Sequence, residues 1–199
     1  MEKMWDKTEE NISIPATDME HYAEHPDVIF VCVKGYSLQE TIPFIKRIAR
    51  KNTIVIPVLN IYGTGGKMQK ELPDLLVTDG CIYVSANIKE PGKLLQHGQI
   101  LHIVFGVRDK AEFRPELKEI QKDLCDSHID GTLSENIRRE ALEKFSYVSP
   151  IGAAGLYYHA TAADFQKEGE ARELFKTMIK EIAALAEAWE FLFRKIWQK

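Results

Sequence analysis

The sequence contains no apolar run near the roughly 20 residues that span a bilayer, and its charged first ten residues lack the apolar core of a signal peptide. The three cysteines, Cys32, Cys81 and Cys125, are odd in number and widely spaced, which argues against a disulfide framework and a zinc site. Cys32 and Cys81 lie in apolar runs and are expected to be buried. The six histidines show no metal-ligand spacing, so no metal is expected. We therefore expect a cytoplasmic protein.

The charge distribution does not indicate a macromolecular partner. The formal net charge is −4, and no block of like charge stands out. Nothing therefore indicates nucleic acid or an anionic membrane surface as a partner.

Nucleotide-binding motifs are also missing from the most glycine-dense stretch, NIYGTGG at residues 60–66. Gly63 and Gly65 match the first pair of G-x-G-x-x-G, but the third position is Met68. A phosphate loop of the G-x-x-x-x-G-K-[ST] type would need glycine at position 61, where the chain has isoleucine, and a hydroxyl at position 68. The spacing favours a turn with positive φ over a phosphate cradle.

The first half of the chain has the pattern of a parallel βαβ unit. DVIFVCVK at residues 27–34 and TIVIPVLN from residue 53 are apolar runs typical of strands buried on both faces. The segment between them, residues 37–51, has apolar residues at helical spacing. A strand, a helix and a strand within about 35 residues predict parallel pairing.

The second half changes character. Apolar runs between residues 81 and 106, broken at KEPG and HG, predict an antiparallel meander. From Arg114 onwards the sequence is rich in helix formers, and Ser134 is a candidate N-cap. The predicted fold is α/β: a partial Rossmann-like dinucleotide-binding domain over residues 1–110, then an all-helical segment over residues 111–199.

Two polar residues follow the predicted parallel strands. Lys34 and Asn60 emerge at the carboxyl edge of the sheet, where open parallel sheets bind ligands. A lysine can donate to phosphate or ribose oxygens, and an asparagine can donate and accept. The alternative is that Lys34 is solvated and that Asn60 caps a turn.

Lys144 is the third candidate. On a helix it falls beside an apolar arc that includes Ile137, Ala141 and Val148. A lysine at such a margin commonly extends to water. The alternative is a partly desolvated lysine with a lowered pKa, which would suit a general acid.

In combination, four stretches resemble the ketopantoate reductases (2-dehydropantoate 2-reductases). They are DVIFVCVKGYSL, TIVIPVLNIYGTG, DGCIYVSANIKEPGKLLQHGQILHIVFG and IRREALEKFSYVSP, and the match runs in order from about Asp27 to Ala188. The resemblance implies NADPH-dependent reduction of a 2-oxo acid to a 2-hydroxy acid, in pantothenate and coenzyme A biosynthesis.

The resemblance also implies roles for individual residues. Lys34 is similar to the family's cofactor-contacting lysine, and Asn60 to its asparagine near nicotinamide and substrate. Ala86, or Ser85 if the register shifts, is similar to a cofactor-lining position. Lys144 is similar to the catalytic lysine that protonates the carbonyl oxygen and contacts substrate.

The chain departs from the family pattern in several places. The family's opening strand with G-x-G-x-x-G has no counterpart here, and the C-terminal helical domain is cut short. Val148 and Gly152 replace two asparagines of better-known members, so the substrate can differ from ketopantoate. The last eleven residues, WEFLFRKIWQK, are hypothesised to arise from a one-base frameshift, because shifted codons can read MGISFPEDM, which is similar to the family's continuation.

Without the family's first strand, the strand at Asp27–Val33 becomes an open edge, which predicts self-association. The resemblance makes a truncated reductase the leading hypothesis. The alternatives are a catalytically inactive remnant and a binding module without enzyme activity.

Overall fold

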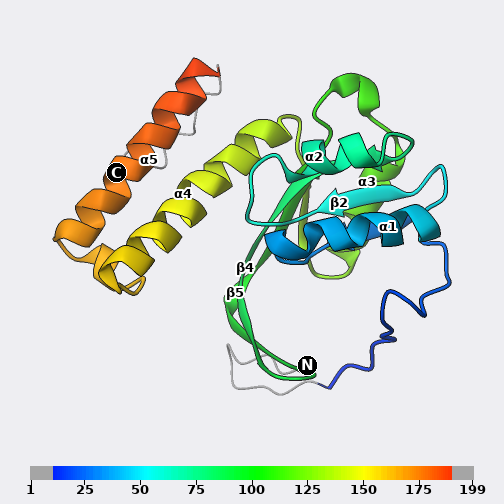
Figure 1. The fold of residues 1–199 in the computed structure, drawn as a ribbon, viewed down its shortest axis with the longest axis horizontal. Coiled ribbons are helices and arrows are strands. Elements are labelled where there is room, and N and C mark those ends of the chain that lie inside the picture. The colour runs from blue at the N-terminus through cyan, green and yellow to red at the C-terminus, as the bar shows by residue number, and fades with distance from the viewer. Residues whose placement is uncertain (1–10, 190–199) are drawn as a thin grey trace.

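The computed structural model describes residues 11–189 and shows an α/β unit followed by two long helices (Figure 1). The strands are β1 (Val28–Val31), β2 (Ile54–Pro57), β3 (Leu76–Val77), β4 (Asp79–Glu90), β5 (Lys93–Gly106) and β6 (Asp130–Leu133). The α-helices are α1 (Leu38–Ile48), α2 (Thr64–Glu71), α3 (Glu116–Asp126), α4 (Ile137–Tyr158) and α5 (Glu170–Ala188). Three 3₁₀ turns are η1 (Gly35–Ser37), η2 (Lys110–Glu112) and η3 (Asp164–Gln166). The predicted α/β fold class is confirmed.

The predicted βαβ unit is present, with strands β1, β2 and β3 all parallel. Strand β2 is buried along its whole length, as its unbroken apolar sequence predicted. Ile54 and Ile56 pack in the core cluster that includes α3 residues, whereas Val55 packs in the cluster that includes α1 and α2 residues. The sheet therefore lies between two helical layers.

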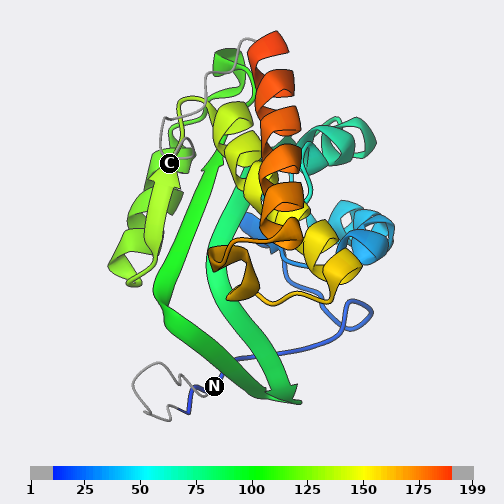
Figure 2. The same cartoon turned by 90° about the vertical axis from the view of Figure 1, so that its left-hand side faces the viewer.

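Strands β4 and β5 form one long hairpin rather than the predicted three-strand meander. The turn at Pro91–Gly92 is real, but the predicted turn at Gly98 is an irregularity within β5. The pairing shifts between Val84, which lies opposite Leu101, and Ala86, which lies opposite Gln96. Between these two pairs β5 has more residues than β4, and Gly98 lies in this bulge with φ of 75°. A positive φ at a bulge is a common reason for glycine. Figure 2 shows the hairpin extending well beyond the body of the sheet.

The expectation that every element after Arg114 is helical is wrong for β6. This strand pairs in parallel with β5, so that His102 lies opposite Asp130. Helix α3 packs its apolar side, Leu117 and Leu124, into the core between β5 and β2. The α/β unit therefore continues through β6 before α4 begins.

Helix α4 is capped by Asn136 rather than by the predicted Ser134. The Asn136 side chain accepts a hydrogen bond from the backbone N–H of Arg139 at 3.2 Å. Ser134 has a supporting place, because its hydroxyl accepts from the Asn136 N–H at 3.0 Å. Helices α4 and α5 then lie against each other, beside the α/β unit (Figure 1).

Four further features of the structure bear on the predictions from the sequence. Strand β1 pairs only with β2 among residues 11–189, so it is an edge strand as predicted. Cys81 is buried as expected, but Cys32 is exposed because it lies beyond the end of β1. No helix within the described part of the chain is long and apolar enough to cross a membrane. Apart from Trp189, the segment with the hypothesised frameshift lies outside the described residues.

Candidate active site

A cavity of about 490 Å³ opens at the carboxyl ends of β1 and β2, beside β4. It contains all four residues singled out from the sequence: Lys34, Asn60, Ala86 and Lys144. The other lining residues are Cys32, Val33, Gly35, Val58, Leu59, Ile61, Ile82 and Val84. A largely aliphatic wall with a few polar groups is typical of a small-molecule site.

The parallel strands bring Lys34 and Asn60 to the same edge. Each residue lies three positions beyond the end of its strand, and both side chains are exposed. The Val58 N–H donates to the Val31 carbonyl at 3.1 Å, so the two chain segments leave the sheet together. The expected placement at a common sheet edge is therefore observed, because strands in a parallel pair end at one side.

Ala86 reaches the cavity from the exposed hairpin. It is exposed and follows Ile82 and Val84, which line the same wall. Ser85, the alternative position considered for the cofactor-lining residue, is not among the lining residues. Of these two positions on β4, Ala86 is therefore the one that lines the cavity.

Lys144 enters the cavity from helix α4. Its Nζ atom lies 4.3 Å from the centroid of the Tyr83 ring, and the side chain is half-buried. Burial lowers the pKa of Lys144, whereas the negative charge of a Cys81 thiolate acts in the opposite direction. A lysine in this place combines a positive charge with a reduced hold on its proton, as a general acid requires.

Two β4 residues beside Lys144, Cys81 and Tyr83, were not predicted to lie at the site. Burial raises the pKa of Cys81 to about 11, although the Lys144 charge acts in the opposite direction. Burial also raises the pKa of Tyr83, so the phenol stays neutral at physiological pH. Both residues were visible only as strand residues, because their contact with α4 depends on tertiary packing.

The glycine-rich loop is a structural turn. Gly63 has φ of 75° and precedes α2, as the positive-φ prediction required. Gly65 lies so close to the strands that a Cβ atom there would be 1.9 Å from the Thr78 carbonyl oxygen. The backbone N–H groups of Gly65 and Gly66 donate to the carboxylate of Asp79. The anion at this helix N-terminus is therefore an internal side chain.

Asp79 is buried, and burial raises its pKa despite the Arg108 guanidinium nearby. The Arg108 Nη1 atom lies 3.7 Å from the Asp79 Oδ1 atom. The sequence does not indicate this pair, because Asp79 begins β4 whereas Arg108 lies beyond the end of β5, and only the fold brings them together. The pair joins β4 and the segment after β5 to the start of α2.

An aromatic cluster fixes the glycine-rich loop to the long helices. Tyr62 stacks on Trp189 at the end of α5, with ring centroids 5.9 Å apart. Its ring also lies 6.4 Å from that of Phe145 on α4. Asn60 therefore lies in a segment that contacts both α4 and the end of α5.

The family resemblance predicts asparagines at two positions, and these positions differ in burial. Val148 is half-buried and lines a narrow crevice with Asn60 and Lys144, next to the main cavity. Gly152 is exposed, and a Cβ atom there would meet nothing within 4 Å. A ligand group that reaches past Lys144 would thus meet an aliphatic side chain.

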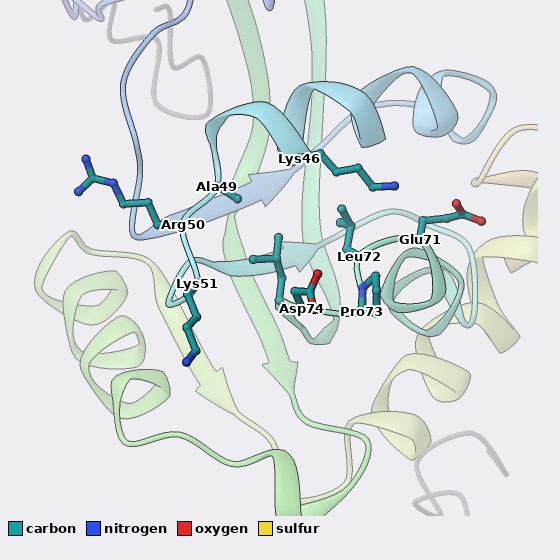
Figure 3. A pocket seen from close by; sticks show the side chains of 9 residues that line it. Lys46, Ala49, Arg50, Lys51, Glu71, Leu72, Pro73 and Asp74 are labelled. Carbon is teal, nitrogen blue, oxygen red and sulfur yellow. The ribbon is translucent and has the colours of Figure 1, made fainter.

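A second hollow, of about 460 Å³, lies at the amino edge of the same sheet (Figure 3). Lys46 of α1, the segment at Arg50 and Lys51, and Leu72 and Asp74 of the α2–β3 connection line it. The Arg50 and Lys51 side chains extend away from the others (Figure 3). None of the four candidate residues lies here. Within residues 11–189, no group of three or more His, Cys, Asp or Glu side chains is arranged to hold a metal ion.

Comparison with known proteins agrees with this architecture. A family model described as "Ketopantoate reductase PanE/ApbA" matches residues 3–110. A 2-dehydropantoate 2-reductase of Aquifex aeolicus (strain VF5) is 20% identical over 171 residues, which are 86% of this chain and 55% of that protein. The chain thus spans about half the length of this relative.

Solved structures show the same fold. A PanE/ApbA family ketopantoate reductase from Ralstonia eutropha JMP134 has a TM-score of 0.83 at 15% identity, over 100% of this chain and 64% of that one. A D-mandelate dehydrogenase solved with NADH and anilino(oxo)acetate has a TM-score of 0.82 at 16% identity, over 96% and 61%. The 2-dehydropantoate 2-reductase from Porphyromonas gingivalis W83 has a TM-score of 0.76 at 23% identity, over 88% and 60%. With the family model matching more than half of its length, the chain belongs to the ketopantoate reductase family.

Proposed function

We propose that this chain carries the nicotinamide side of a reductase that converts a 2-oxo acid into a 2-hydroxy acid with NADPH. The observation that carries the proposal is the convergence of Lys144, Lys34 and Asn60 on one cavity of about 490 Å³. Membership of the ketopantoate reductase family supports the same reaction class. The substrate class is a small 2-oxo acid.

The described residues fit one part of the cofactor. The cavity volume lies within the roughly 300–1,000 Å³ of small-molecule pockets, and its aliphatic wall suits the flat nicotinamide ring. The pyrophosphate does not fit at the start of α2, because Asp79 already accepts hydrogen bonds from Gly65 and Gly66. Lys34 remains the described cation best placed for an anionic group at this edge.

When bound, NADPH supplies the hydride for carbon 2 of the oxo acid. The Lys144 ammonium donates a proton to the carbonyl oxygen and stabilises the negative charge that develops there. Burial lowers the pKa of Lys144 and so eases the proton's departure. The Asn60 amide orients the substrate by donating to its carbonyl or carboxylate oxygen.

A second function, binding without turnover, is favoured by one observation. Asp79 occupies the helix N-terminus that would otherwise attract the pyrophosphate, which weakens the case for tight NADPH binding. The chain would then be an inactive remnant or a binding module. It would keep Lys34 and Asn60 as a small anion site.

The test is a fluorescence titration with NADPH, followed by measurement of NADPH consumption with a panel of 2-oxo acids. We expect Lys34→Ala to weaken NADPH binding about tenfold, the loss of roughly one charge-assisted hydrogen bond. We expect Lys144→Ala to lower kcat by about 10²–10⁴-fold, the usual worth of general acid catalysis, with little change in NADPH affinity.

Lys46→Ala is the matched control, because Lys46 lines the second hollow at the opposite edge of the sheet. It should change neither quantity. If no 2-oxo acid is turned over, binding of NADPH or of a small anion such as inorganic phosphate would favour the binding module, and binding of neither would favour the inactive remnant.

A further inference from the structure

The ammonium of Lys144 lies over an aromatic ring. Its Nζ atom is 4.3 Å from the Tyr83 ring centroid, well inside the roughly 6 Å limit for a cation–π interaction. Such a contact favours the charged form of the lysine, because the ring face carries negative charge density. It therefore opposes the effect of burial on the same group.

The Tyr83 ring is itself held in place from strand β5. Tyr83 lies directly opposite His102 in the antiparallel pair, and the two rings stack with centroids 5.4 Å apart and an interplanar angle of 21°. His102 is fixed in turn, because its Nε2 atom lies 3.1 Å from the Thr132 hydroxyl on β6. Three paired strands thus define where the ring face lies.

We infer that Tyr83 is a positioning residue for Lys144, holding the ammonium at the cavity wall and keeping it protonated. The inference rests on the proposed function where it concerns turnover, but the placement of the ammonium can be tested without turnover. The neutral ring acts here, since burial keeps the phenol protonated. A ring without the hydroxyl should therefore suffice.

Several titratable or charged groups surround this contact and share in its pH dependence. They are Cys81 on β4, His102 on β5, Glu140 and Glu143 on α4, and Lys34 across the cavity. The Tyr83 variants leave all of these groups in place. A change in Lys144 between variants therefore reports on the ring.

The experiment compares Tyr83→Phe, which keeps the ring, with Tyr83→Leu, which removes it at similar bulk. Lysines of the full chain are reductively ¹³C-methylated, and the Lys144 signal is assigned by its loss in Lys144→Arg. In the wild type and Tyr83→Phe, we expect this signal to be displaced upfield by the ring. In Tyr83→Leu, we expect that displacement to vanish and the lysine's pKa to fall by about half a unit to one unit.

Kinetics provide the second measurement where 2-oxo acid reduction is detected. Tyr83→Leu should lower kcat about tenfold with KM nearly unchanged, and should move the basic limb of the pH profile to lower pH. Tyr83→Phe should resemble the wild type in both. If no variant or wild-type chain turns over, the proposed function fails while the NMR displacement still decides the placement.

Either of two results would overturn the inference. One is a Lys144 signal and pKa that do not change in Tyr83→Leu. The other is an equal loss in Tyr83→Phe and Tyr83→Leu, which would assign the effect to the hydroxyl. If Tyr83→Leu does not fold by circular dichroism, Tyr83→Met replaces it, because methionine adapts to irregular packing.

Discussion

The glycine-rich turn makes opposite predictions for two adjacent glycines of α2. At Gly65, a Cβ atom would lie 1.9 Å from the Thr78 carbonyl oxygen and 2.4 Å from the Asp79 Oδ1 atom. At Gly66, the nearest atom would be the Arg108 Cδ at 3.8 Å, an ordinary contact. Gly65→Ala should therefore destabilise the protein strongly, and Gly66→Ala should not.

The size of the destabilisation by Gly65→Ala depends on whether Thr78 or helix α2 moves to make room for the new Cβ atom. Real Cβ atoms essentially never lie within 3.0 Å of another non-bonded atom, so at 1.9 Å the neighbours must separate by at least about 1.1 Å. Thr78 cannot yield, because it is fully buried and its N–H donates to the Val55 carbonyl at 3.0 Å. Helix α2 must move instead, carrying the buried Met68 and Leu72 out of the core.

Overpacking of this kind costs about 1–3 kcal/mol, and weakened hydrogen bonds to the buried Asp79 carboxylate add about 1.5–3 kcal/mol. Alanine's better helix propensity returns about 1 kcal/mol. The net expected loss for Gly65→Ala is about 3 kcal/mol, or roughly 6–12 °C in Tm. Gly66→Ala keeps only the propensity gain, about 0.4–1 kcal/mol of added stability.

The assay is urea unfolding followed by far-UV circular dichroism, with the midpoint read at constant m. Equal midpoints for Gly65→Ala and the wild type would refute the steric argument. If that variant were stable but had lost NADPH binding, the loop would be a ligand loop rather than a structural turn.

Four further predictions concern charge and the sheet edge. Asp79→Ala should cost about 1–3 kcal/mol in urea unfolding, because Arg108 would lose its closest carboxylate and keep only Glu112 and the Gln69 amide oxygen; an unchanged midpoint would argue against the pair. Since the folded-state pKa of Asp79 is raised, its contribution to stability falls as pH rises above 3.8; Asp79→Asn should flatten this part of the stability curve. Lys144 has a lowered folded-state pKa, so its contribution rises as pH increases towards 10.5; Lys144→Met should remove that rise, and an identical pH dependence would contradict it. Phe30 on the β1 edge is 37% exposed, so Phe30→Lys should abolish self-association in light scattering; a wild-type chain that is monomeric at high concentration would contradict the edge-pairing idea.

Much of the sheet could be predicted because its strands carry their own signal. The run that forms β2 is apolar throughout, since both faces of the strand are covered by helices. Strand β6 has only four residues, including Gly131, and its extended state comes from pairing with β5. A sequence of that length without an apolar pattern cannot indicate a strand.

The hairpin shows the same limit for turns. Both His97–Gly98 and Pro91–Gly92 contain a glycine that can mark a turn, and both glycines have positive φ. Only the pairing across the strands separates a chain reversal from a bulge.

Some residues of the candidate site could be predicted from the sequence, and others could not. Lys34 and Asn60 could be found because parallel strands bring their carboxyl ends to one edge, a rule that needs no side-chain detail. Tyr83 could not, because its contact with Lys144 joins β4 to α4 across about 60 residues of sequence. Alternation along β4 indicates a face, but not which helix covers it.

Asp79 occupies the place at the start of α2 where a dinucleotide's pyrophosphate would bind. Its carboxylate and a pyrophosphate are both anions and would need the same two N–H donors, those of Gly65 and Gly66. Moving the carboxylate away would leave Arg108 without its closest acidic partner and would uncap α2. The start of α2 therefore cannot exchange one anion for the other without loss of stability. If the proposed function holds, the charged groups of NADPH rely on side chains such as Lys34 within residues 11–189, and we expect its affinity to fall steeply with added salt.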